Sequence, residues 1–173
     1  MRAGLLILAI GAWAGATDAS AQDAAPKPWE IVPAPAIPPD RLIPLDQALA
    51  AVRTAQAACL LKNSPTTVQV VDLNGNIKVL LSADGARGNS FEAARRKAYT
   101  VLKKGMASSA FARSIGSPPP NSLIENDSSL RASGGGVPIV RNGTIIGALA
   151  VSGPTGQVDD EACALAGLAE FKF

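Results

Sequence analysis

Two Asn-Gly pairs, each set among aliphatic and β-branched residues, constrain the fold of this chain more than any other feature. Asn74-Gly75 lies within residues 66–81, and Asn142-Gly143 lies within residues 134–153. An Asn-Gly pair favours a two-residue type I′ turn, because both central positions of that turn need a positive φ. The sequence therefore predicts two β-hairpins. The similarity of the two stretches indicates that one structural unit occurs twice, rather than an array of repeats.

The second strand of the later hairpin, Thr144–Ser152, is apolar along its whole length and rich in small residues. Such a run is typical of a central strand that is buried on both faces. Gly147 interrupts it, and a glycine inside a strand indicates close approach by another backbone or by a ligand.

Helical patterns flank both hairpins. We expect helices over 45–62, 90–104 and about 159–171, with a short additional helix in 106–116. This order predicts an α/β (α+β) fold with a central antiparallel sheet of about four to five strands from two hairpins, and with helices packed on the sheet.

The helix at 90–104 is predicted to be amphipathic, with Phe91, Ala94, Ala98 and Val101 on its apolar face. Its opposite face is predicted to be basic and centred on Thr100. The residues assigned to this basic face are Arg96, Lys97, Thr100, Lys103 and Lys104.

The N-terminal region divides the chain into three parts. Residues 1–21 have the pattern of a signal peptide, with a short apolar core and a small-residue cleavage site that makes Gln22 the expected mature N-terminus. Residues 22–44 are rich in Pro and Ala and are predicted to be a linker or an arm. Residues 45–173 form the predicted domain. Because residues 1–21 resemble a signal peptide, we expect a periplasmic or secreted protein without a stable membrane anchor.

The chain contains two cysteines and no histidine. The absence of histidine excludes a Ser-His-Asp triad, a zinc site with histidine ligands and a haem site with a proximal histidine. Export would permit a disulfide between Cys59 and Cys163, but two buried thiols that never meet are an equal alternative. The net charge of +2 does not point to nucleic acid as a partner.

Three segments are candidates for ligand binding. The basic face around Thr100 can attract an anion, Asp84-Gly85 can form a loop at a pocket mouth, and Gly134–Gly136 can offer backbone N–H groups. Each segment also has an ordinary structural interpretation, as a solvated helix face, a turn or a strand entry. No spacing of carboxylates points to acid–base catalysis, and no catalytic residue is assigned.

Several ordered motifs together resemble the GlcG/HbpS family, which includes the C-terminal domain of PduO-type proteins. The matching pieces are VVDLNGN at 70–76, ADGA at 83–86, RRKAYT at 95–100, GGGVPIV at 134–140 and GALAVSG at 147–153. The resemblance covers nearly all of 45–171. It implies a small α/β domain that forms homo-oligomers and, in the exported branch, binds haem. Ser82 and Asn89 depart from residues that are common in relatives.

The resemblance also implies a site. Thr100 matches the family's threonine near the haem iron, beside Lys97 and Tyr99, and Gly134–Pro138 is predicted to face the Asp84 loop and the Thr100 helix. The predicted ligand-binding residues are Thr100, Lys97, Tyr99, Arg96, Asp84, Gly85, Gly135 and Gly136, with Thr100 as the metal contact.

The predicted function is binding of haem, or of a similar anionic planar ligand, in sensing or scavenging rather than in catalysis. Two alternatives stay open at this point. One is an enzyme that acts on a small organic acid in the same pocket, with Asp84, Tyr99 and Lys97 as its candidate acids or bases. The other is an oligomeric scaffold without a ligand.

Overall fold

The structure is a computed structural model that describes residues 35–116 and 127–173. The predicted signal peptide and most of the predicted arm lie outside the described residues. In chain order the elements are η1 (Pro39–Arg41), α1 (Leu45–Leu60), β1 (Thr67–Asp72), β2 (Ile77–Ser82), α2 (Ser90–Lys104), α3 (Ser108–Ile115), β3 (Gly136–Arg141), β4 (Thr144–Ser152) and α5 (Gln157–Leu168).

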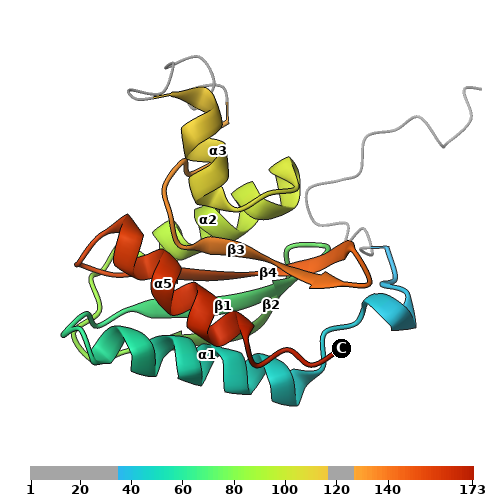
Figure 1. Ribbon diagram of the computed structural model, residues 1–173, viewed down its shortest axis with the longest axis horizontal. Helices are drawn as coiled ribbons and strands as arrows, with labels where there is room; N and C mark the ends of the chain where they lie inside the picture. Colours follow the sequence, from blue (N-terminus) through green and yellow to red (C-terminus); the bar gives the residue numbers. More distant parts are fainter. Residues whose placement is uncertain (1–34, 117–126) are drawn as a thin grey trace, which may run out of the picture. The chain divides into compact units, whose positions relative to one another are not determined.

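The strands form a four-stranded antiparallel sheet in the order β2-β1-β4-β3 (Figure 1). The two predicted hairpins supply its outer pairs, and β1 pairs with β4 between them, with Thr67 opposite Ser152. The predicted fold class and sheet are therefore confirmed, at the lower end of the expected strand number.

The two hairpin turns differ in type. Asn142 and Gly143 have φ values of 50° and 75°, as a type I′ turn requires. In the first hairpin only Gly75 has a positive φ, of 78°, and its N–H donates to the carbonyl of Asp72. That connection is a three-residue loop with glycine in the left-handed position, because the Asp72 carboxylate accepts hydrogen bonds from the N–H groups of Asn74 and Asn76 and holds a wider turn.

Helices cover both faces of the sheet. On one face α1 and α5 pack over an aliphatic cluster that includes Val52, Val68, Val70 and Leu149. On the other face α2 packs over smaller side chains. Ala94, Ala98 and Val101 of α2 form this second cluster with Val71 of β1 and with Ala148 and Ala150 of β4.

The central strand β4 is buried from Ile146 to Ser152, as predicted. A Cβ atom at Gly147 would collide with the carbonyl oxygen of Val71 and would lie 2.5 Å from Cδ1 of Ile43. The predicted close approach of another backbone at Gly147 is thus confirmed, and the neighbour is β1.

The predicted division of α2 into an apolar face and a basic face is wrong at three positions. Lys97 and Thr100 are 2% and 0% exposed, whereas Phe91 is 44% exposed. The reason is that α2 packs against the segment that leads into β3 as well as against the sheet. The segment that leads into β3 contacts α2 at Arg131 and Gly136, so the helix buries a wider arc than its apolar residues mark.

A disulfide joins Cys59 of α1 to Cys163 of α5 in this structure. Both cysteines are buried. Within the described residues, no helix has the length and apolar character needed to cross a membrane.

Candidate functional site

Lys97, a predicted ligand-binding residue, forms a buried ion pair in this structure. Its Nζ lies 2.7 Å from Oδ2 of Asp160 and also donates to the carbonyl oxygen of Val151 at 2.9 Å. Both charged side chains are 3% exposed. Burial is the largest influence on both groups: it lowers the pKa of Lys97 and raises the pKa of Asp160, while their mutual attraction opposes each shift.

The predicted site glycines pack against this ion pair. A Cβ atom at Gly135 would lie 2.8 Å from Nζ of Lys97 and 2.6 Å from the carbonyl oxygen of Val151. A Cβ atom at Gly136 would lie 2.8 Å from the carbonyl oxygen of Lys97. In this structure the two glycines therefore let the start of β3 approach α2 closely.

Thr100 is fully buried, and its hydroxyl makes two hydrogen bonds. Its Oγ1 donates to the carbonyl oxygen of Arg96 at 2.7 Å and accepts from the N–H of Arg131 at 2.7 Å. Iron coordination by Thr100 stays a prediction, and in this structure the packing around this fully buried side chain would have to open for a ligand to reach it.

Lys103 is the cation of α2 that contacts the segment 127–131. Lys103 forms an ion pair with Asp127, and its Nζ lies 5.5 Å from the ring centre of Tyr99. The hydrogen bonds from Lys103 and Ser129 lower the pKa of Asp127 to about 2. Arg96 and Tyr99 are half-buried.

Asp84 and Gly85 do not join this group. They are exposed and follow β2, whereas Gly135 and Gly136 introduce β3 at the opposite edge of the sheet. Three strand spacings separate these edges, which amounts to roughly 14 Å. The structure therefore brings together Lys97, Gly135 and Gly136, and it leaves the Asp84 loop apart from them.

A different feature has the shape of a ligand site. An apolar groove of about 400 Å³ lies between α5 and β3, within the size range of small-molecule sites. We call it the α5–β3 groove. Its lining residues are Ala107, Val137, Pro138, Ile139, Val140, Glu161, Leu165, Leu168, Phe171 and Phe173.

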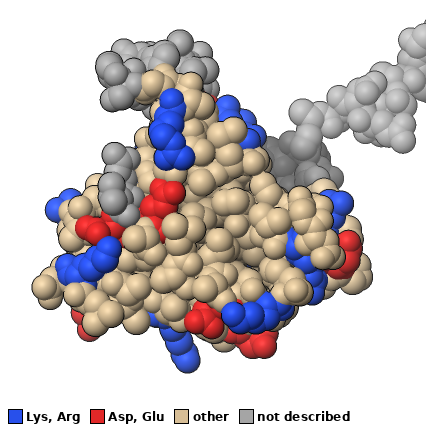
Figure 2. Space-filling view, viewed as in Figure 1, with Lys and Arg blue, Asp and Glu red and all other residues tan. Residues whose placement is uncertain are grey.

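Each wall of the α5–β3 groove exposes hydrophobic side chains to solvent. Val140 on β3 is 44% exposed, Leu165 on α5 is 52% exposed, and the C-terminal Phe173 is 44% exposed. The rings of Phe171 and Phe173 stack with their centres 5.8 Å apart. Figure 2 shows the same face with an uncharged central area and charged side chains around its margin.

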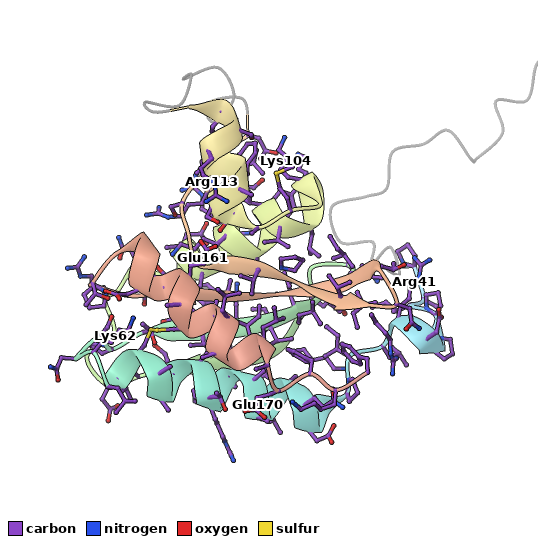
Figure 3. The ribbon with its side chains drawn as sticks, viewed as in Figure 1. Arg41, Lys62, Lys104, Arg113, Glu161 and Glu170 are labelled. Carbon is purple, nitrogen blue, oxygen red and sulfur yellow. A yellow bond between two sulfur atoms is a disulfide. The ribbon has the colours of Figure 1, made fainter. Side chains whose placement is uncertain are left out.

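The single charged lining residue is Glu161. It comes from α5 where that helix faces α3 (Figure 3), and its Oε1 accepts a hydrogen bond of 2.7 Å from the hydroxyl of Ser109. The sequence analysis did not assign this groove. The available signal was the C-terminal Phe-Lys-Phe, which places two of the four phenylalanines of the chain within three residues.

Comparisons with known proteins agree with the fold. The family model described as "Haem degrading protein HbpS-like" matches residues 43–169. An uncharacterized 15.0 kDa protein from the dhaT-dhaS intergenic region of Citrobacter freundii is 32% identical over 119 residues, which cover 68% of this chain and 84% of that protein.

Two solved structures are similar as well. The crystal structure of HbpS has a TM-score of 0.69 at 28% identity, covering 87% of this chain and all of that one. The crystal structure of a PduOC–haem complex has a TM-score of 0.69 at 23% identity, covering 75% of this chain and 94% of that one, and at this identity it supports the fold alone.

Proposed function

Because this chain belongs to the HbpS-like family of haem degrading proteins, we propose that it binds haem or a similar anionic tetrapyrrole in the α5–β3 groove. The description of the family model that matches residues 43–169 names haem, and this supports a tetrapyrrole as the class of ligand. Binding serves sensing or scavenging in this proposal.

The observation that carries the proposal is the apolar lining of the groove. A porphyrin ring is a flat apolar surface, and nine of the ten lining residues are apolar. Glu161 adds a carboxylate, which suits a hard ferric ion, although histidine and thiolate are the stronger haem ligands. The donor set therefore fits a bound tetrapyrrole that exchanges with solution, and haem would supply the iron centre that a sensor detects.

An enzyme acting on a small organic acid has less support. Its candidate acids and bases do not converge, because Lys97 is paired with Asp160 and Asp84 lies at the far edge of the sheet. A scaffold without a ligand is the outcome if the protein binds no tetrapyrrole.

Export and assembly belong to the same proposal. We place the protein outside the cytoplasm, as a homo-oligomer, on the signal-like residues 1–21 and the family resemblance. The Cys59–Cys163 disulfide supports this location, because such bonds persist in oxidising compartments. Cell fractionation with N-terminal sequencing should find mature protein that begins at Gln22, and light scattering should give a mass above that of one chain.

Hemin titration tests the proposed site. The wild type should shift the Soret band of hemin, and Leu165→Glu should weaken binding by at least tenfold, because it places a charge on the apolar wall. Thr100→Val is the comparison variant, since it removes the hydroxyl of the site predicted from sequence. If Thr100→Val abolishes the shift and Leu165→Glu leaves it intact, the groove is the wrong site.

A further inference from the structure

The two ends of the α5–β3 groove differ in charge. At the end next to α3, Glu161 lines the groove, and Ser109 holds its Oε1 at 2.7 Å. Among the described residues no hydrogen bond is made to its second oxygen, Oε2, so this oxygen keeps its accepting capacity. This end of the groove therefore offers a fixed carboxylate.

A cation, Arg141, lies next to the groove at Phe173, on the side of the lining residue and not in the lining itself. The guanidinium carbon of Arg141 lies 4.7 Å from the ring centre of Phe173, which lines the groove. One of its nitrogens, Nη1, donates to the carbonyl oxygen of Asp40 at 3.1 Å, which ties the side chain to the residues before α1. A guanidinium has five N–H donors, so Arg141 retains donors for a carboxylate ligand.

We infer that the α5–β3 groove binds its ligand in one orientation, with ligand carboxylates at the Arg141 end and a metal or other electron-poor centre toward Glu161. This inference rests on the proposed function. Reversing the ligand would bring its carboxylates toward Glu161, and two like charges in an apolar groove repel strongly. Arg141 is thus assigned to recognition of the acid groups, and Glu161 to contact with the metal side.

Three probes separate the two roles: hemin, metal-free protoporphyrin IX, and the dimethyl ester of protoporphyrin IX. Arg141→Gln should weaken binding of the diacid protoporphyrin by roughly tenfold, because it removes a charge-assisted hydrogen bond. The same variant should leave binding of the dimethyl ester within about twofold of the wild type. Arg53→Gln is the matched control, since Arg53 is exposed on α1 and does not line the groove.

Glu161→Gln should alter the charge-transfer bands of bound hemin and leave the affinity for metal-free protoporphyrin within about twofold. Glu170→Gln is its matched control. Glu170 also accepts a hydroxyl hydrogen bond, 2.9 Å from Thr54, but it does not line the groove. Circular dichroism confirms that each variant is folded before it is titrated.

The outcomes separate the inference from the proposal beneath it. If Leu165→Glu blocks hemin while Arg141→Gln and Glu161→Gln match their controls with all probes, the orientation is wrong and the binding site stands. If Arg141→Gln weakens the ester as much as the diacid, Arg141 only shapes the groove and its assignment is overturned. If the wild type binds none of the three probes, the proposed function and the inference both fail.

Discussion

Lys97 and Asp160 hold three elements together through one buried contact. The pair links α2 to α5, and Lys97 also reaches the carbonyl of Val151 in β4. Removing two charges from water costs several kcal/mol per ion, and the attraction between them repays this cost only in part. The pair therefore acts in positioning the elements more than in raising the net stability.

Removing one partner should cost far more than removing both. We expect Lys97→Met to lower the free energy of unfolding by about 3–5 kcal/mol, because it leaves Asp160 as an uncompensated buried charge. Lys97→Met combined with Asp160→Asn should recover most of this loss. Guanidinium denaturation of the two single variants and the double variant gives the coupling, and additive losses would contradict the account.

Single residues differ in how well their sequence context predicts them. Gly147 was predictable, because a glycine within a long apolar strand has few explanations other than close backbone contact. Lys97 was not predictable, because helical periodicity marks the face toward the sheet and says nothing of a second surface. The segment before β3 buries Lys97 and Thr100, and this packing is a long-range contact.

At the scale of elements, the Cys59–Cys163 disulfide fixes α1 against α5. The two helices pack over the same aliphatic cluster, and the linked cysteines are 104 residues apart in sequence. The sequence left this bond open, because spacing alone does not reveal whether two helices meet. A cross-link that closes so long a loop restricts the unfolded chain strongly.

Replacing both cysteines by alanine should lower the free energy of unfolding by about 2–5 kcal/mol and leave the fold intact. Guanidinium denaturation of the oxidised wild type and of the double variant measures the difference. An equal stability of the two proteins, with no free thiols in the wild type, would show that the bond contributes nothing.

The contact between α2 and the segment at 127–131 should depend on pH. The pKa of Asp127 is lowered to about 2 by Lys103 and Ser129, below its ordinary value of 3.8. Because the folded-state pKa is the lower one, its contribution to stability is present above pH 3.8 and is lost as the pH falls toward 2.

Lys103→Ala should raise the pKa of Asp127 toward 3.8 and reduce the loss of stability between pH 4 and pH 2. NMR titration of the Asp127 carboxyl carbon gives the pKa, and thermal melts across the same pH range give the stability. An unchanged titration of Asp127 in this variant would remove Lys103 as the cause.

At the scale of the whole molecule, the order of elements was readable from the sequence, and the groove was not. Turn residues and apolar periodicity are local signals, and they identified both hairpins and the helices around them. The α5–β3 groove is lined by residues of β3, α5 and the C-terminal segment, which are far apart in sequence. No local sequence pattern predicts that these residues come together.

The most direct test of the account is methyl NMR with hemin. Ferric hemin is paramagnetic and broadens nearby methyl signals, and zinc protoporphyrin is the diamagnetic control. The account predicts broadening of the methyl signals of Val140, Leu165 and Leu168 by hemin alone. Broadening confined to Val101 and Leu130, beside Thr100, would contradict the groove as the binding site.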